Sequence, residues 1–302
     1  MTKKVLITGS NGLLGQKLVN LFSLDEKYKV HAVSLGKNRN ETAKNYTYYN
    51  LDITNSESFN TMLYKESPEI IINCAAITNV DQCETDKELC DKLNVEAVKN
   101  LVGFCKEKGA HLVHISTDFI FDGEAGPYSE EDTPNPVNYY GLSKLKSEEI
   151  IKSSAIYYTI LRTILVYGIV DNMNKGNIVL FVKQALEQQK QVTMVDDQFR
   201  MPTLADNLAQ ACYLAVVENA YGVFHVSSSE LMSIYDMALQ IAEVFKLDAT
   251  LIKRISTGQL RQPAKRPKHT GFYVNKVREL GLQINGFKED LFKFKNQLKQ
   301  LS

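Results

Sequence analysis

The feature that most limits how this chain can fold is a glycine-rich turn near its start, where the apolar stretch "KVLITG" runs into "SNGLLGQ". Gly9, Gly12 and Gly15 recur at every third residue, where a predicted strand becomes a predicted helix. Glycine permits positive φ in a tight turn and lets the backbone approach a diphosphate closely. The N-terminus of the next helix offers free N–H groups and a positive dipole end. The turn therefore predicts a dinucleotide site, with a purely structural turn as the alternative.

The first half of the sequence alternates short apolar strands with amphipathic helices. Strands such as "KVHAVSL", "EIIINCAA" and "AHLVHIST" are separated by helical segments such as "SESFNTMLYKE". This alternation indicates a parallel sheet covered on both faces, which is a Rossmann-type doubly wound α/β fold. After residue 168 the pattern becomes less regular. We therefore expect an NAD(P)-binding Rossmann domain over residues 1–168 and a smaller, less regular substrate-binding lobe over 169–302. The helix near 203–218 is a candidate to return to the first domain.

Charge and cysteine content exclude several classes of protein. Lys+Arg and Asp+Glu are both 35, so the net charge gives no sign of a nucleic-acid partner. No apolar stretch reaches the ~20 residues of a membrane span, and the N-terminal apolar run is too short for a signal peptide. The five cysteines form no CxxC pair, which is typical of a reducing compartment and favours neither disulfides nor zinc. We expect a cytoplasmic protein without a metal site or a membrane partner.

The end of the second predicted strand bears on the choice of cofactor. NAD-binding proteins usually carry an acidic residue there for the ribose hydroxyls. This chain instead has Ser34, Lys37 and Arg39, with no acid before Glu41. Basic groups at this place favour the 2′-phosphate of NADPH, and NADH is the alternative. The competing interpretation is that Lys37 and Arg39 are ordinary charged residues of a loop.

The stretch "NYYGLSKLK" places Tyr140 four residues before Lys144, so both side chains lie on one face of a predicted helix. Ketone reduction needs a hydride donor and a proton for the developing alkoxide. Tyr140 can supply that proton if a neighbouring cation, here Lys144, lowers the tyrosine pKa from about 10. A hydroxyl from Thr117, or from Ser116, would hydrogen-bond the substrate oxygen. These residues predict a reductase active site at the carboxyl ends of the strands.

Several motifs together carry a family resemblance. "TGxxGxxG", a Ser/Thr after the fifth strand and "YxxxK" are similar to the extended short-chain dehydrogenase/reductase family. Within it, "STDFIFDG", "YGLSK", "LRTILVYG", "DDQFRMPT" and "RPKHTGF" most resemble the dTDP-4-dehydrorhamnose reductases. The resemblance implies reduction of a 4-keto sugar attached to a nucleoside diphosphate, with NADPH or NADH, in carbohydrate biosynthesis. By the same analogy a homodimer is expected.

The resemblance also implies roles for individual positions. Thr117, Tyr140 and Lys144 would be the catalytic residues, with Tyr140 and Lys144 also touching the cofactor. The other implied cofactor contacts span the glycine turn and the ends of later strands: Gly9, Asn11, Gly12, Leu13, Leu14, Gly15, Asp52, Ile53, Ala75, Ala76 and Thr78. Asn94 would lie near the sheet edge under the site. The candidates on the substrate side are Ser116, Thr117, Asp118, Phe119, Leu165, Arg200 and Arg266. Of these, Asp118 is expected to orient its loop, and Arg200 and the 261–268 segment to meet the anionic end of the substrate.

Two departures limit the prediction of a particular sugar. Rhamnose-forming reductases typically read "STDYVFDG" and "RTSWVYG", whereas this chain has Phe119 and Leu165 and contains no Trp. A missing tyrosine hydroxyl removes a hydrogen bond worth about 1 kcal/mol, and a missing Trp removes a stacking surface. Reductase chemistry should survive these changes, but rhamnose specificity need not.

A second class of function stays open. The resemblance extends to the beta subunit of methionine adenosyltransferase, whose role is to bind a catalytic partner. "QFRMPT" has Arg200 where the rhamnose reductases more often carry Gly, which is similar to that branch. The alternative is therefore a cofactor-binding regulatory subunit. Turnover would separate the two functions, whereas cofactor binding would not.

Overall fold

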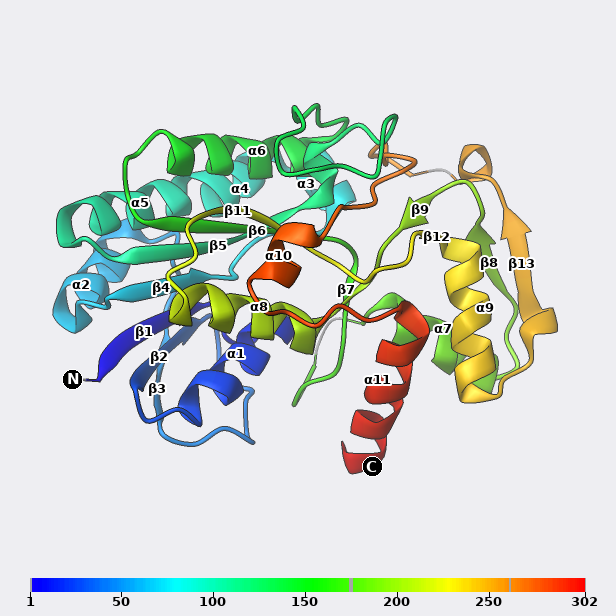
Figure 1. Cartoon of the computed structure of the whole chain (residues 1–302), viewed down its shortest axis with the longest axis horizontal. Helices are drawn as coiled ribbons and strands as arrows, with labels where there is room; N and C mark the ends of the chain where they lie inside the picture. Colours follow the sequence, from blue (N-terminus) through cyan, green and yellow to red (C-terminus); the bar gives the residue numbers. More distant parts are fainter. Residues whose placement is uncertain (1, 174–175, 261, 302) are drawn as a thin grey trace.

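A seven-stranded parallel sheet forms the larger part of the molecule (Figure 1). The computed structural model describes residues 2–173, 176–260 and 262–301. From one edge to the other the sheet contains β3 (Tyr46–Asn50), β2 (Tyr28–Ser34), β1 (Lys3–Thr8), β4 (Ile70–Asn73), β5 (His111–Thr117), β6 (Tyr158–Thr163) and β11 (Gly222–Val226). The order reverses between β1 and β4. In open α/β sheets, ligands bind at such a reversal, at the carboxyl ends of the strands.

Helices cover both faces of this sheet, which confirms the predicted Rossmann-type fold (Figure 1). Val5 and Ile7 of β1 belong to the core cluster under one face, and Leu6 belongs to the cluster under the other. This alternation follows from the period of two along a strand. The first face is covered by α1 (Leu13–Ser23), α8 (Ala205–Val217) and α10 (Asn275–Glu279), and the second by α2 (Ser56–Glu66), α5 (Ala97–Lys108) and α6 (Tyr139–Lys152).

The smaller lobe has a core of its own. Three helices pack around buried residues such as Val182, Ile241 and Phe294. They are α7 (Ile178–Glu187), α9 (Ile234–Phe245) and α11 (Phe287–Leu301). The lobe also contains three two-stranded pairings: β8 (Val192–Val195) with β13 (Ile252–Ile255), β9 (Phe199–Arg200) with β12 (Met232–Ser233), and β7 (Val166–Tyr167) with β10 (Thr203–Leu204).

The chain after residue 168 does not stay in the smaller lobe. The expected return of a helix near 203–218 corresponds to α8, which packs beside α1. β11, which contains "VFHV", also lies after residue 168 and pairs in parallel with β6 of the large sheet. The residues from 205 to 226 therefore lie with the sheet, so the expected lobe over 169–302 is not one continuous segment.

The helical stretch from residue 87 to residue 108 is not one uniform α-helix. It consists of α4 (Lys87–Asp91), a π-helical turn (Lys92–Glu96) and α5. A shorter helix, α3 (Val80–Thr85), precedes it, and 3-10 turns occupy Asp118–Ile120, Ala249–Leu251 and Thr257–Gln259. Single π-turns inside helices are frequent at functional sites. This one contains Asn94.

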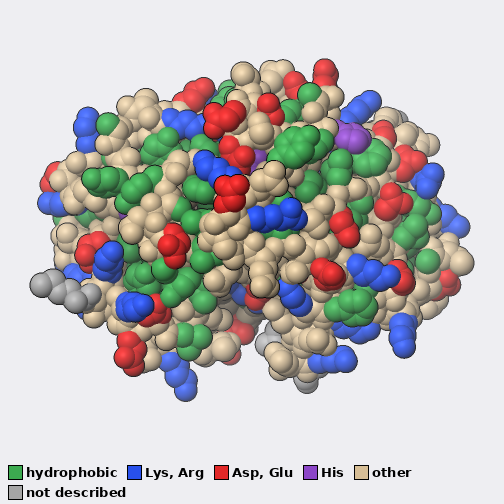
Figure 2. All heavy atoms as spheres, in the orientation of Figure 1, with side chains coloured by type: hydrophobic (Ala, Val, Ile, Leu, Met, Phe, Trp, Pro, Cys, Tyr) green, Lys and Arg blue, Asp and Glu red, His purple; other side chains and the backbone are tan. Residues whose placement is uncertain are grey.

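The molecular surface carries both signs of charge. Lys and Arg are interspersed with Asp and Glu over both lobes on the face shown in Figure 2. Within the part of the chain that the structure describes, no helix is long and apolar enough to cross a membrane. The same residues form no cluster of His, Cys, Asp and Glu that could hold a metal ion.

Candidate active site

The glycine turn joins β1 to α1 at the point where the strand order reverses. Gly9 has φ of +64°, and a Cβ on it would lie 2.8 Å from the backbone N of Ala75. A Cβ on Gly15 would lie 2.3 Å from the carbonyl oxygen of Gly9. Contacts this short require glycine at both positions, because the turn, the helix and the end of β4 pack backbone to backbone.

The N-terminus of α1 suits a diphosphate group. Its N-cap residue, Gly12, supplies no side-chain hydrogen bond, whereas α2, α6, α7 and α9 are each capped by an Asn or Ser side chain. The Ser10 hydroxyl in the same turn is buried and has no hydrogen-bond partner among the described residues. Free helix N–H groups and an unpaired buried hydroxyl are what an anionic ligand would satisfy. The turn therefore fits a dinucleotide.

Asn11 acts on the loop after β2 through its side chain. Its amide nitrogen donates to the carbonyls of Leu35 and Lys37, and its oxygen accepts from the backbone N–H of Arg39. The Tyr48 hydroxyl donates to the Ser34 carbonyl in the same loop. The loop that carries Lys37 and Arg39 is thus held against the glycine turn, with the Lys37 side chain exposed.

The other expected cofactor positions differ in what occupies their polar atoms. One oxygen of the Asp52 carboxylate accepts from both the backbone N–H and the hydroxyl of Thr54, so Asp52 stabilises a local turn. Ile53 is buried in the core. Ala75 donates its N–H to the Thr8 hydroxyl, and the short side chains of Ala75 and Ala76 are half-buried beside the glycine turn. Thr78 is exposed beyond them, and the aliphatic Leu13 and Leu14 begin α1.

Tyr140 lies in the first turn of α6 and is 9% exposed. Asn138 caps this helix by accepting from the N–H of Gly141. A Cβ on Gly141 would lie 2.0 Å from the carbonyl oxygen of Phe119, so only glycine lets α6 approach the segment after β5 this closely. Our sequence reasoning missed Gly141, although a glycine inside a helical pattern is itself a signal of close packing.

The electrostatics of Tyr140 differ from our expectation. Burial raises the pKa of its phenol above the ordinary value, while a hydrogen bond with Thr117 opposes this rise and the negative charge of Asp118 adds to it. We expected Lys144 to lower this pKa, but the dominant influence is loss of water around a buried phenol. Tyr140 stays protonated at neutral pH, but the raised pKa makes it a weaker acid, so proton donation would depend on neighbours that stabilise its phenolate.

Lys144 lies one turn further along α6 and is only 2% exposed. Burial lowers the pKa of its ammonium to about 8. Its Nζ lies 3.0 Å from Nε2 of His114, which is fully buried on β5. Sequence reasoning treated His114 as part of an apolar strand and missed this contact.

Ser116 and Thr117 are neighbours on β5 and point to opposite faces. Thr117 is the residue beside Tyr140, and its hydroxyl donates to one oxygen of Asp118 at 3.1 Å. Ser116 instead lies near Glu148, which is buried and paired with Arg162, and the Ser116 hydroxyl has no hydrogen-bond partner among the described residues. Of the two hydroxyls considered for the substrate, the structure thus places Thr117 at Tyr140 and Ser116 away from it.

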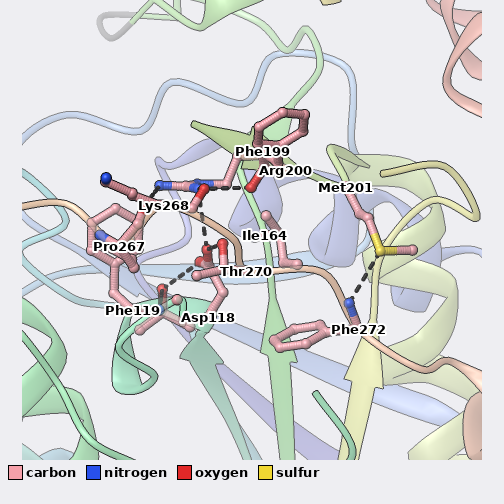
Figure 3. Close-up of polar contacts among 12 residues, drawn as sticks. Asp118, Phe119, Ile164, Phe199, Arg200, Met201, Pro267, Lys268, Thr270 and Phe272 are labelled. Carbon is pink, nitrogen blue, oxygen red and sulfur yellow. Dashed lines mark hydrogen bonds and ion pairs between the residues drawn. The ribbon is translucent and has the colours of Figure 1, made fainter. Parts of the chain in front are cut away.

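Arg200 is part of the protein interior, in contrast to our expectation of an anion-binding side chain (Figure 3). Its guanidinium donates to the carbonyls of Phe199, Pro267 and Lys268, and its Nε lies 3.7 Å from the Asp118 carboxylate. Asp118 also accepts from the Thr270 hydroxyl. Arg200 and Asp118 therefore fix the 267–270 loop to the end of β5. This placement agrees with the expectation that Asp118 orients its loop.

The Arg266 side chain also binds other groups of the protein. Its guanidinium pairs with the Asp81 carboxylate at 2.8 Å and donates to the Ala264 carbonyl. Lys265 and Lys268 on either side of it are exposed. They line a cleft of about 860 Å³ together with His269 and the loop from Asp122 to Gly126. Arg261, from the same basic segment, lies outside the described residues.

Phe119 contacts Tyr140, and Leu165 lies after the end of β6. The Phe119 ring lies edge-on to that of Tyr140, with 5.8 Å between centroids, and beneath the Arg200 guanidinium at 5.7 Å. Leu165 follows β6 with φ of +42° and is 37% exposed. A branched residue in left-handed backbone is unusual and occurs mostly where function constrains the chain.

Asn94 secures the helix that carries Tyr140. From the π-helical turn its side chain exchanges hydrogen bonds with the backbone N–H and carbonyl of Ile77, and it donates to the Ser143 hydroxyl. Asn94 is 1% exposed, so it is not a helix-surface amide. It joins the segment after β4 to α6, under the site.

Comparisons with known proteins agree with this architecture. The chain belongs to the RmlD substrate binding domain family, which it matches over residues 3–300. It is 30% identical to the bovine (Bos taurus) methionine adenosyltransferase 2 subunit beta, over 97% of this chain and 88% of that protein. It is 33% identical to a probable low-salt glycan biosynthesis reductase, Agl14, of Haloferax volcanii, over 94% and 95% of the two chains.

A solved structure is equally similar. The dTDP-4-dehydrorhamnose reductase of Bacillus anthracis, in complex with NADP, superposes with a TM-score of 0.86 at 30% identity, over 98% of this chain and 100% of that one. These similarities confirm the predicted family resemblance. They also support the prediction of an oxidoreductase that belongs with the nucleotide-sugar reductases.

Proposed function

We propose that this member of the RmlD family is an NADPH-dependent reductase of a nucleotide-activated 4-keto sugar. The observation that carries the proposal is the meeting of Thr117, Tyr140 and Lys144 at the carboxyl end of the sheet, where the strand order reverses next to the glycine turn. Each comes from a regular element or its end, so the sheet and α6 fix their relative positions.

The cofactor would lie across the carboxyl ends of β1 and β4. The N–H groups at the start of α1 and the Ser10 hydroxyl would hold its diphosphate. Lys37 and Arg39 would meet the 2′-phosphate from the loop that Asn11 anchors. When bound there, NADPH would supply the hydride for reduction of the sugar carbonyl. The Bacillus anthracis reductase with NADP has the same fold, which supports this choice of cofactor, with NADH as the alternative.

Tyr140 would donate the proton that the sugar oxygen takes up. Burial raises the pKa of the phenol and makes it a weaker acid, while the hydrogen bond with Thr117 opposes that rise. The Lys144 ammonium, with a pKa of about 8, would stabilise the phenolate that remains. Thr117 would hydrogen-bond the same substrate oxygen and orient the carbonyl. General acid catalysis of this kind typically contributes about 10²- to 10⁴-fold in rate.

The substrate would extend from this centre into the cleft beside the 264–269 loop. Lys265 and Lys268 provide positive charge there for a diphosphate, while Arg266 holds the loop through Asp81. Phe119 and Leu165 would face the sugar. Phe119 lacks the hydroxyl with which Tyr would form a hydrogen bond, and Leu165 lacks the flat ring with which Trp would stack. We therefore propose a 4-keto sugar without committing to rhamnose.

The test is NADPH consumption with dTDP-4-keto-6-deoxy-L-mannose as substrate. Tyr140→Phe should lower kcat by about 10²- to 10⁴-fold and leave NADPH binding intact, because only the proton donor is lost. The matched control is Tyr139→Phe, since the Tyr139 hydroxyl donates to the Asp91 carboxylate, whereas the Tyr140 hydroxyl meets Thr117. Equal losses in both variants would contradict the role of Tyr140.

A regulatory role is the second candidate. The similarity to methionine adenosyltransferase 2 subunit beta over nearly the whole chain favours it, as does Arg200 in "QFRMPT". Tight NADPH binding without turnover of any nucleotide-activated keto sugar would move the weight to this function.

A further inference from the structure

A row of buried polar side chains crosses three adjacent strands and ends at Lys144. Thr8 of β1 is in register with Asn73 of β4, and Asn73 is in register with His114 of β5. The Thr8 hydroxyl donates to the amide oxygen of Asn73 at 2.6 Å, and the amide nitrogen of Asn73 lies 3.1 Å from Nδ1 of His114. The row begins beside Gly9 and closes with the 3.0 Å contact between His114 Nε2 and Lys144 Nζ.

The four side chains are almost completely shielded from solvent. Their exposed fractions are 0% for Thr8, 2% for Asn73, 0% for His114 and 2% for Lys144. In such surroundings every donor needs an acceptor, because an unpaired buried polar group destabilises the folded protein. The proton positions along the row are therefore coupled.

The charge on Lys144 decides which nitrogen of His114 bears the proton. An ammonium only donates hydrogen bonds, so it requires an unprotonated Nε2 and places the imidazole proton on Nδ1. Asn73 must then reverse its amide from the orientation in the structure, so that its oxygen faces Nδ1–H of His114 and its NH₂ faces the Thr8 hydroxyl. A neutral amine instead accepts from Nε2–H, and Asn73 then donates to Nδ1, which is the orientation in the structure.

We propose that His114 is a positioning residue for Lys144: its neutral imidazole accepts the ammonium hydrogen bond through Nε2 and is oriented by Asn73 through Nδ1–H. His114 would not touch the substrate or the reacting atoms. When Lys144 loses its proton, the donor and acceptor roles along the row are exchanged, and His114 changes tautomer. The inference rests on the proposed function only in giving Lys144 a catalytic role.

The other charges around Lys144 are consistent with this arrangement. Glu148 lies on the same helix, Cys74 follows β4 and Cys90 comes from α4; each favours the ammonium form, whereas burial opposes it. Burial and the ammonium itself hold the pKa of His114 well below its usual value, so the ring stays neutral. A charged ring would repel Lys144 instead of accepting from it.

The first experiment uses the unmodified chain without substrate or cofactor. Nitrogen-15 NMR of the histidine rings should show His114 with its proton on Nδ1 at pH 6.5–7, identified by comparison with His114→Gln. Its tautomer should change with the same midpoint as the Lys144 side chain, followed through carbon-13-labelled Cε and assigned with Lys144→Met. A proton on Nε2 at neutral pH would overturn the proposal.

Variants give the second experiment. His114→Leu removes the acceptor, so the Lys144 midpoint should fall by at least one pH unit, and the alkaline limb of the kcat/KM profile should move with it. His114→Gln keeps an acceptor, so the Lys144 midpoint of this variant should lie close to the wild-type value. The matched control, His111→Leu, removes a buried histidine of the same strand that bonds Thr159, and should leave the Lys144 midpoint unchanged.

The outcomes separate this inference from the proposed reaction. A purely structural His114 would lower the melting temperature of His114→Leu without moving the Lys144 titration, and that result would overturn the inference. Absence of turnover in the wild-type chain would count against the reductase alone, because neither NMR titration requires a substrate.

Discussion

The two sides of the candidate site are built in different ways. On the cofactor side, Thr117, Tyr140 and Lys144 are positioned by a strand, a helix and a row of in-register strand residues. On the substrate side, the 264–270 loop is held by a few long-range contacts made by Arg200 and Arg266. The geometry of the reacting groups thus depends on regular structure, whereas the shape of the substrate site depends on single buried side chains. Substitutions should therefore damage the two sides separately.

The largest effect should come from Arg200→Leu. This change leaves the Asp118 carboxylate buried without its cation, and breaking a buried pair typically costs about 3–5 kcal/mol of unfolding free energy. Denaturant unfolding measures the loss, and hydrogen exchange should show it concentrated in the 264–270 loop, with NADPH affinity nearly unchanged.

The matched control for Arg200 is Arg254→Leu. Arg254 pairs with Asp196 on the surface with a side chain 62% exposed, so its loss should cost less than about 1 kcal/mol. Adding Asp118→Asn to Arg200→Leu should recover part of the stability by removing the unpaired charge. Equal costs for the two arginines would contradict the buried-clamp interpretation.

Gly15→Ala tests the cofactor side. The new Cβ would lie 2.3 Å from the Gly9 carbonyl oxygen, so α1 must shift. Overpacking of this kind costs about 1–3 kcal/mol, and NADPH affinity should fall at least tenfold by isothermal titration. Gly103→Ala is the control, because no described atom lies within 4 Å of its added Cβ. In a helix interior that change should stabilise the chain by about 0.5–1 kcal/mol.

Mild acid should weaken the sheet before the smaller lobe. His31, His111, His114 and His225 are buried in sheet strands, and burial lowers the pKa of each; for His111 it falls to about 4. Below pH 6.5 these histidines bind protons in the unfolded chain but stay neutral in the folded chain. Stability is therefore complete above that pH and falls by about 1.4 kcal/mol per pH unit for each fully shifted histidine.

Hydrogen exchange at pH 7 and pH 5 measures this difference. Amides of β2, β5 and β11 should lose protection more than those of α7 and α9. His111→Gln should reduce the difference, since it removes one of the groups that must stay neutral. Uniform loss across both lobes would contradict the assignment of acid sensitivity to the sheet.

The smallest effect on stability should come from Leu165→Gly. Relief of left-handed strain, worth about 1–2 kcal/mol, is partly offset by the greater backbone entropy of unfolded glycine, about 0.5–1 kcal/mol. The melting temperature should hardly change, while KM for the sugar nucleotide should change. The neighbouring Ile164 is fully buried, so Ile164→Ala should cost about 2–5 kcal/mol. A large loss from Leu165→Gly would mean that this side chain supports the fold instead of the site.

Much of the cofactor side could be predicted from sequence because its signals are local. The spacing of Gly9, Gly12 and Gly15, the strand and helix periods, and the four-residue interval from Tyr140 to Lys144 all follow from the geometry of a single element. The structure agrees with the fold that they predict. The place of Gly141 was readable for the same reason and was missed.

The sequence by itself therefore determined the doubly wound fold and the position of the glycine turn, and it supplied the prediction of the catalytic residues. Only the tertiary structure decided that Arg200 clamps a loop, that β11 joins the sheet, that His114 contacts Lys144 and that burial raises the pKa of Tyr140. The physical reason is that partners, burial and charge environment depend on segments far apart in the chain. Arg200 and Asp118, for example, are brought together by the return of the chain across the sheet edge, which no local pattern specifies.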